Sequence, residues 1–167
     1  MKIPVFVSSP TVLTDKQKKA KKTIINQLIR LGLENRALGQ SDYPTESPLH
    51  EVYVLSKHCA GGIILGFEQF RADSCIVKPN TKSEIKLSLP KSFPTPWNQL
   101  EAGILFSLGL PLLIFKEPGI SGGIFDEGVT DVFIHQMPKP SMTLNEKRAL
   151  EAVFLKWQAG VRKIYYQ

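Results

Sequence analysis

The chain has 167 residues, of which 43% are hydrophobic and 22% are charged, a balance typical of one globular domain with a full-sized core. The longest apolar run, 102–115, is broken by glycines and a proline, and no signal-peptide pattern follows Met1. These features predict a cytoplasmic protein that does not enter a membrane. Two distant cysteines and three scattered histidines lack metal-ligand spacing, so we expect reduced thiols, no metal and no cofactor.

The formal net charge is +6, and five lysines of the segment 16–22 contribute much of it. A lysine-rich helix face is more often simply solvated than bound to nucleic acid. No aromatic residue interleaves with these lysines, and no nucleic-acid-binding motif is visible. We therefore do not expect nucleic acid as a partner, although a basic surface attracts nucleotides.

The first part of the chain predicts a strand, a turn and a helix. Residues 2–8 (KIPVFVS) favour a strand, and Ser8, Ser9 and Pro10 turn the chain at its carboxyl end. Ligands of open α/β sheets bind at carboxyl ends of strands, so these three residues are candidate binding positions. For each residue taken alone, a plain turn is the favoured explanation. Thr14–Gln17 then forms a capping box for a helix that ends at Gly32.

Two further strands and a helix follow. Residues 33–38 (LENRAL) predict a short strand, and the loop 39–46 contains Asp42, Tyr43 and Pro44. A second helix begins at Ser47-Pro48 and is expected to pack through Leu49, Val52, Leu55 and Cys59. Residues 60–67 (AGGIILGF) are apolar throughout, as in a strand buried on both faces of a parallel sheet. Phe67 and Gln69 lie at its carboxyl end. Phe67 suits either stacking on a base or covering the core.

The second half repeats the alternation of strand and helix after an insertion at about 71–91. Within the insertion, 75–78 and 84–89 are predicted to pair as a hairpin. Segment 110–116 predicts a buried strand, 117–126 a glycine-rich loop with a weak phosphate-binding signal, and 131–136 a strand near a sheet edge. A second capping box at Thr143–Glu146 begins the last helix. This order predicts an α/β fold with three layers and a mostly parallel, flavodoxin-like sheet, forming one domain over 1–167.

Between the insertion and the strand 110–116 lies the segment on which the functional argument rests. Thr95 is a good N-cap and Pro96 suits the first helical position, so a helix is predicted from here to about Gly109. Its core stripe is expected at Trp97, Leu100, Ile104, Leu105 and Leu108. Glu101 occupies one position of that stripe. A carboxylate placed among hydrophobes either has a structural role, as the partner of a buried Arg or Lys or as a cap of backbone amides, or lies in a cleft with a perturbed pKa.

Several motifs together resemble the nucleoside 2-deoxyribosyltransferase-like proteins and the related TIR-like domains. They are the first strand ending in Ser-Pro, the strand GIILG at 62–66, and WNQLEAG at 97–103 followed by GLPL at 109–112. The resemblance implies that Glu101 attacks or stabilises the anomeric carbon of a ribose while the base leaves. The aspartates that the transferases carry shortly before this glutamate are missing, since 94–97 reads PTPW.

The sequence thus predicts an enzyme that cleaves or exchanges an N-glycosidic bond in NAD, a nucleoside or a nucleotide, with Glu101 as nucleophile or oxocarbenium stabiliser. Asn98 is expected to hold a ribose hydroxyl, and Trp97 either stacks on the base or anchors the core. Ser9, Phe67 and Gln69, which come from two other strand ends, complete the expected pocket. The alternative is a sensor that binds a nucleotide or cyclic nucleotide without cleaving it, in a bacterial stress or defence system. A homo-oligomer is compatible with either prediction.

Overall fold

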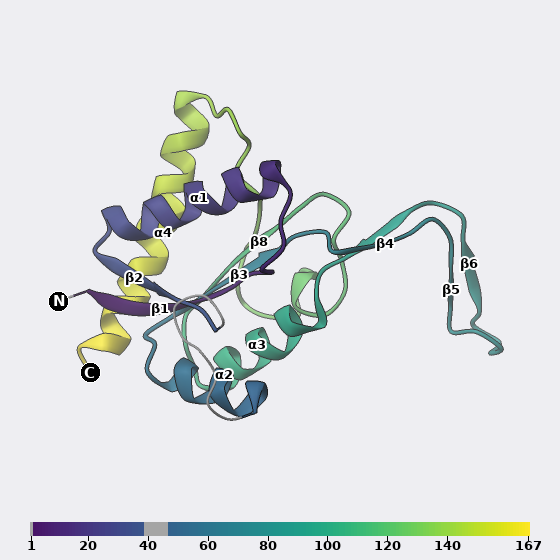
Figure 1. Cartoon of the computed structure of the whole chain (residues 1–167), viewed down its shortest axis with the longest axis horizontal. Helices are drawn as coiled ribbons and strands as arrows, with labels where there is room; N and C mark the ends of the chain where they lie inside the picture. The colour runs from purple at the N-terminus through teal and green to yellow at the C-terminus, as the bar shows by residue number, and fades with distance from the viewer. Residues whose placement is uncertain (1, 39–46) are drawn as a thin grey trace.

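A computed structural model describes residues 2–38 and 47–167 (Figure 1). The predicted loop 39–46, with Asp42, Tyr43 and Pro44, lies outside the described residues. The fold is α/β, with a parallel five-stranded sheet in the order β2-β1-β3-β8-β9. The strands are β1 (Ile3–Ser8), β2 (Leu33–Arg36), β3 (Gly62–Gly66), β8 (Leu112–Lys116) and β9 (Ile134–Gln136).

Helices cover both faces of this sheet, which gives the predicted three layers. Helices α1 (Asp15–Arg30) and α4 (Leu144–Tyr165) lie on one face, and α2 (Pro48–Lys57) and α3 (Pro96–Ser107) lie on the other. Among the described residues, no helix is long and apolar enough to cross a membrane.

The alternation of side chains along the strands produces two separate cores. In β1, Val5 and Val7 point to the α1/α4 layer, whereas Phe6 points to the α2/α3 layer. The same alternation divides Ile63 from Ile64 in β3. Ser8 follows Phe6 by two positions, so the pleat turns its hydroxyl toward α3. This register determines which residues reach the site described below.

The predicted helix starts are confirmed. Thr14 and Thr143 both form complete capping boxes, and the Thr95 hydroxyl accepts a hydrogen bond from the backbone N–H of Asn98. The first helix ends before Gly32, whose φ of +72° is the left-handed conformation that glycine adopts without strain.

The predicted core stripes of α3 and α2 are partly wrong. Trp97 is 42% exposed and Leu100 is 47% exposed, and the buried residues of α3 are instead Asn98, Ala102 and Leu105. The missing side chain of Gly62 in β3 leaves room for Leu105 of α3, since a Cβ there would meet the Leu105 side chain at 2.7 Å. Asn98 faces inward because its amide is hydrogen-bonded to Ser8 and to the Leu65 carbonyl. In α2, Leu49 is likewise exposed rather than buried.

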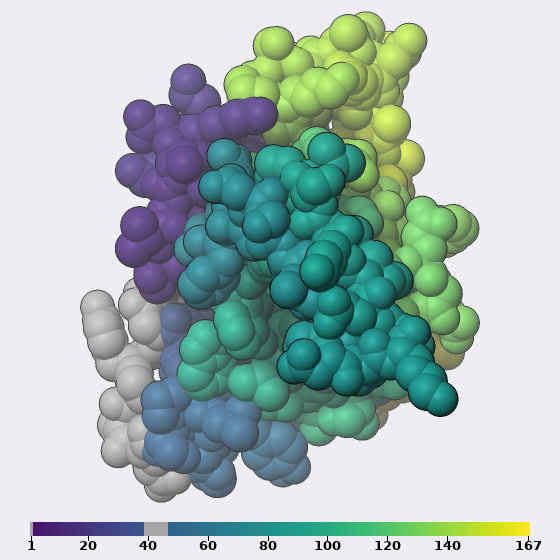
Figure 2. Space-filling view, turned by 90° about the vertical axis from the view of Figure 1, so that its right-hand side faces the viewer, coloured from purple at the N-terminus to yellow at the C-terminus, as the bar shows by residue number. Residues whose placement is uncertain are grey.

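The predicted insertion is a long antiparallel arm. Strand β4 (Phe70–Ala72) pairs with β7 (Lys91–Phe93) near the body, and β5 (Cys75–Val77) pairs with β6 (Ile85–Leu87) further out. The predicted hairpin is therefore confirmed. The arm projects beyond the carboxyl edge of the sheet (Figure 1), and Figure 2, which looks at the molecule from that side, shows it in teal at the front.

The last two strands are connected without a long helix. The glycine-rich segment between β8 and β9 contains only one 3₁₀ turn, η1 (Gly123–Phe125). Strand β9 pairs with β8 and ends the strand order, which confirms its predicted position at an edge.

Candidate functional site

A cavity of about 410 Å³ lies at the carboxyl ends of the strands, between the turn after β1 and the start of α3. The base of the arm and the ends of β2 and α2 complete its wall. Parallel α/β sheets bind ligands at this edge because loops from several strands converge there. The lining residues are Ser9, Pro10, Thr11, Val12, Leu38, Pro48, Gln69, Thr95, Trp97, Asn98 and Glu101.

Three polar side chains connect β1 to α3 beneath this cavity. Asn98 is 1% exposed, and its Nδ2 donates to the Ser8 Oγ at 2.8 Å and to the Leu65 carbonyl at 3.4 Å. The hydroxyl of Ser8 in turn faces the carboxylate of Glu101 and lowers its pKa. Asn98 thus holds the Ser8 oxygen as an acceptor, which leaves the Ser8 proton for Glu101.

Glu101 is partly buried, and this burial raises its pKa from 4.5 to about 7. The Ser8 hydrogen bond acts in the opposite direction, because it stabilises the carboxylate. No lysine, arginine or histidine is among the described residues that line the cavity. The structural ion pair considered above is therefore not found within the described part of the chain. Near neutral pH, Glu101 exchanges a proton readily between its two forms.

The amide of Asn98 is already occupied by protein partners. Besides the two bonds made by Nδ2, its Oδ1 accepts from the Thr95 hydroxyl at 3.2 Å. The expectation that Asn98 holds a ribose hydroxyl does not fit this arrangement. Asn98 fixes the start of α3 and the direction of the Ser8 hydroxyl, so its role is to position Glu101.

Trp97 and Gln69 both belong to the cavity wall. Trp97 is half-exposed and belongs to the lining, which argues against the alternative that it anchors the core. The side chain of Gln69 donates to the carbonyls of Val12 and Glu68, at 3.3 Å and 3.1 Å. The wall therefore has an aromatic side chain free to stack on a planar ring and an amide held by the loop after β1.

The arm is fastened to the body next to Gln69. The Glu68 carboxylate accepts from Arg71 at 2.5 Å and from Ser92, and both bonds lower its pKa. The backbone N–H of Glu68 donates to Glu117 at 2.7 Å, and Gln17 donates to the same Glu117 oxygen at 2.9 Å. The acid that follows the central strand thus has a structural role.

The cavity lining includes most of the residues expected from the sequence: Ser9, Pro10, Gln69, Trp97, Asn98 and Glu101. Ser8 is not in the lining, because it is buried beneath it and reaches Glu101 from below. Phe67 is the exception. It is fully buried in the core of the α1/α4 layer, because the alternation of β3 turns it away from α3. It does not stack on a ligand in this cavity.

Other parts of the lining were not anticipated. Thr11, Val12, Leu38 and Pro48 come from the loop after β1, the end of β2 and the start of α2. The sequence does contain a usable signal for them, since all of these segments follow or precede predicted strands at the same sheet edge. Thr95 was identified only as an N-cap, and a cap at the carboxyl edge of a sheet faces the cleft as well.

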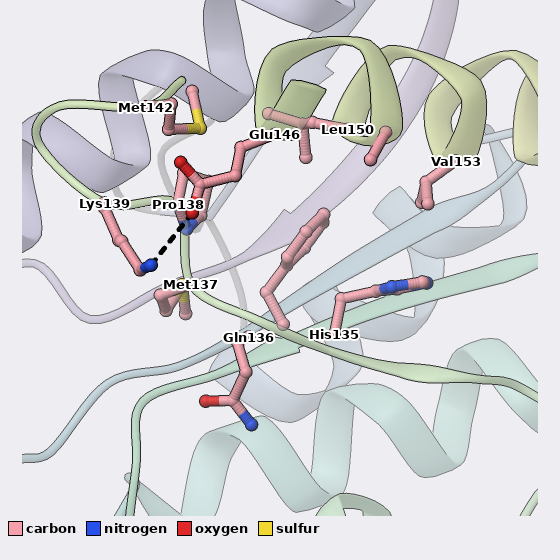
Figure 3. A pocket seen from close by; sticks show the side chains of 11 residues that line it. His135, Gln136, Met137, Pro138, Lys139, Met142, Glu146, Leu150 and Val153 are labelled. Carbon is pink, nitrogen blue, oxygen red and sulfur yellow. Dashed lines mark hydrogen bonds and ion pairs between the residues drawn. The ribbon is translucent and has the colours of Figure 1, made fainter. Parts of the chain in front are cut away.

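A second cavity of about 360 Å³ lies between β9 and α4 (Figure 3). Its wall is largely apolar and includes Phe115, Leu150 and Val153. Its carboxylate, Glu146, is bonded to Lys139 at 2.8 Å and caps the backbone of Thr143. This pairing lowers the pKa of Glu146 to about 2, so the group is a fixed anion. Of the two carboxylates, Glu101 is therefore the better candidate for acid–base or covalent chemistry.

The glycine-rich loop after β8 does not present an open phosphate cradle. Gln99 of α3 fills it, accepting from the backbone N–H of Ile124 at 2.9 Å and donating to the carbonyl of Gly122 at 3.0 Å. In the described part of the chain, no group of three or more His, Cys, Asp or Glu side chains is placed to hold a metal ion.

Comparisons of the chain with protein-family models, with curated proteins and with solved structures find no match.

Proposed function

We propose that this protein is an enzyme that cleaves or exchanges an N-glycosidic bond, with Glu101 as the acting carboxylate. The observation that carries the proposal is a partly buried glutamate with a pKa of about 7 in a cavity at the carboxyl edge of a parallel sheet. Numbered within the sheet alone, the strand order becomes 2-1-3-4-5, which supports a flavodoxin-like arrangement. The resemblance of 97–103 to the deoxyribosyltransferase-like and TIR-like proteins points to the same residue.

The chemistry follows from the charge that develops on the sugar. As the bond between the anomeric carbon and the base nitrogen breaks, its electron pair leaves with the base and positive charge builds on the ribose. The Glu101 carboxylate either stabilises that charge or bonds to the anomeric carbon. A water or a second base then completes hydrolysis or transfer. Ser8 keeps the carboxylate oriented, and Trp97 supplies a face for the base.

The composition of the lining favours one substrate among those predicted. Glu101 is the only ionisable side chain among the described residues that line the cavity. A neutral purine or pyrimidine leaves readily only after an acid protonates it, and a second group suited to that task is missing from this lining. The nicotinamide of NAD already carries a positive charge and leaves as a neutral molecule without a proton. NAD is therefore the substrate that fits best.

The direct test is chromatography of NAD, nucleosides and nucleotides after incubation with the wild type and with Glu101→Gln. We expect free nicotinamide from the wild type and a loss of about 100-fold or more in the variant, the size seen when a group stabilising transition-state charge is removed. Glu34→Gln, on the exposed part of β2, is the matched control and should keep wild-type turnover. Equal turnover by Glu101→Gln would reject the mechanism.

The dependence of turnover on pH provides a second test of the role of Glu101. A reacting carboxylate predicts that turnover rises as the pH increases through about 7, where Glu101 loses its proton. Turnover that falls over the same range would instead assign Glu101 as an acid. Saturable binding of an unchanged nucleotide or cyclic nucleotide, without any released base, would favour the alternative of a sensor.

A further inference from the structure

The outer part of the arm, here called the distal ribbon (75–89), has an apolar face without a covering layer in the described structure. Cross-strand pairing places Cys75 opposite Leu87 and Val77 opposite Ile85, so these four side chains share one face. Ile85 is 54% exposed, and Ile76 on the other face is 53% exposed. An isolated two-stranded ribbon is marginally stable in water, so a further surface is needed to support it.

The arm is also basic. Over residues 70–93 it carries five cationic side chains and two acidic ones, a net charge of +3. Lys82 and Lys86, near the tip, are both exposed. Lys86 lies 4.0 Å from Glu84, a contact at the limit of an ion pair, and Lys82 has no ion pair among those that the described residues form.

A complementary surface lies on the body of the same chain. The segment 126–134, here called the acidic edge surface, runs between η1 and β9 and contains Asp126, Glu127 and Asp131 without any lysine or arginine. It surrounds a cavity of about 270 Å³ lined by both Glu127 and Asp131 together with Val132 and Phe133. The nearest cation shown is Lys156 of α4, whose Nζ lies 5.9 Å from the centre of the Phe133 ring.

Exposed apolar side chains mark this surface as well. Phe133 is 76% exposed and Val129 is 55% exposed. The segment appears in green at the right of Figure 2, while the teal arm extends toward the viewer and away from the body. The arm of one molecule therefore points outward, where the acidic edge surface of another molecule can meet it.

We propose that the distal ribbon of one copy docks onto the acidic edge surface of a second copy. An apolar side chain of the ribbon enters the cavity beside Phe133, and Lys82 and Lys86 pair with Glu127 and Asp131. Apolar burial supplies the affinity and the opposite charges set the register. Since the two surfaces are different, reciprocal docking joins two copies through two equivalent contacts.

A second copy fits the arm better than a nucleic acid does. A phosphate backbone would satisfy the lysines, but the four-residue apolar face would stay in water. The acidic edge surface offers both a carboxylate pair and a cavity whose wall includes Val132, Phe133 and Ile134, and its charge is opposite to that of the arm. This assignment is independent of Glu101 and of the reaction proposed for it.

The test is sedimentation velocity of the full chain over a concentration series, with two charge-reversed variants. The arm variant is Lys82→Glu/Lys86→Glu, and the surface variant is Glu127→Lys/Asp131→Lys. We expect a dimer for the wild type and loss of the dimer in each variant alone. Mixing the two variants should restore the dimer, because each arm then meets an opposite charge. Lys16→Glu/Lys19→Glu on α1, which changes the net charge equally, should leave the dimer intact.

Two outcomes would overturn the proposal. One is a wild type that stays monomeric over the whole series. The other is a dimer that survives both reversals, or is lost in them without returning on mixing while circular dichroism shows folded protein. A monomer whose arm variant alone loses salt-dependent binding to a duplex oligonucleotide would assign the arm to nucleic acid instead.

Discussion

The N-termini of α3 and α4 are capped in the same way, but the side chains of their first turns make different contacts. Each helix has a threonine N-cap whose hydroxyl accepts from the backbone three residues later, Thr95 from Asn98 and Thr143 from Glu146. In α4, the residue at that third position is Glu146. Its carboxylate accepts one hydrogen bond from the backbone N–H of Thr143 and another from Lys139. In α3 it is Asn98, whose amide turns inward to Ser8 and Leu65.

The consequence is a difference in the two glutamates. Glu146 is partly exposed, pairs with Lys139 and caps the backbone of Thr143, and its pKa falls to about 2. Glu101 lies one turn after Asn98, is partly buried, and has a hydroxyl as its partner, so its pKa rises to about 7. A helix start that uses its acid for capping has a stable end. In α3, the Asn98 amide bonds to the sheet instead of a glutamate capping the helix, so the carboxylate of Glu101 is free to face a cavity.

The largest effect that this comparison predicts is on stability at high pH. Glu101 binds its proton more tightly in the folded state than at its ordinary value of 4.5, so stability falls as the pH rises from about 4.5 to about 7. The difference between these two pKa values corresponds to about 3 kcal/mol of unfolding free energy at most, and solvent at the cavity mouth reduces this contribution. Glu101→Gln is expected to gain most of this free energy of unfolding at pH 8 and little at pH 4, measured by urea denaturation.

Glu146→Gln is the matched control with the opposite sign. The folded-state pKa of Glu146 is lowered, so its contribution is present above pH 4.5 and is lost as the pH falls toward about 2. This variant should therefore be less stable than the wild type at pH 7 and converge with it in acid. If both variants shifted stability in the same direction, the contrast between the two helix starts would be incorrect.

Much of the structure of the two helix starts can be predicted from the sequence, because capping motifs and apolar alternation depend on residues close together in the chain. Thr14, Thr95 and Thr143 are recognisable as caps, and the buried strand at 60–67 is recognisable from composition. Glu101 is recognisable as a polar residue among hydrophobes. The inward direction of the Asn98 side chain is not recognisable, because Trp97 and Leu100 are the large apolar residues of that turn in the sequence. The inward position of Asn98 depends on hydrogen bonds to Ser8 and Leu65, which lie 90 and 33 residues away in the sequence.

The arm and the lining illustrate a second limit. Pairing of 75–77 with 85–87 follows from alternation, but the direction in which the ribbon leaves the body depends on contacts of Glu68 with Arg71, Ser92 and Glu117. Those partners are up to 49 residues apart in sequence. Phe67 was placed at a strand end correctly, and only the register of β3 decides that it faces the core.

A middle-sized effect is expected from Asn98→Ala. Three hydrogen bonds of a buried amide are lost and the Leu65 carbonyl loses a donor, so the free energy of unfolding should fall by about 2 kcal/mol. Without Asn98, the Ser8 hydroxyl is no longer held toward Glu101, so the pH at which turnover is half-maximal should rise.

Gln158→Ala in α4 is the control for that variant. Gln158 is a buried amide that donates to the Leu31 carbonyl at 2.8 Å, far from the cavity. It should lower stability without moving the pH profile of turnover. A profile that is the same for Asn98→Ala and the wild type would leave Asn98 with a purely structural role.

The smallest expected effect is the difference between removing the Thr95 cap and removing the Thr143 cap. Thr95→Ala and Thr143→Ala each remove a hydroxyl that accepts from the helix backbone, and each should cost about 1 kcal/mol of unfolding free energy. Only Thr95 also donates to Asn98 and lines the cavity, so only Thr95→Ala should reduce turnover at saturating substrate. Thermal unfolding and nicotinamide release, measured on the same preparations, make the comparison. Equal loss of turnover in both variants would mean that the effect follows stability alone, and the link from cap through amide and hydroxyl to carboxylate would fail.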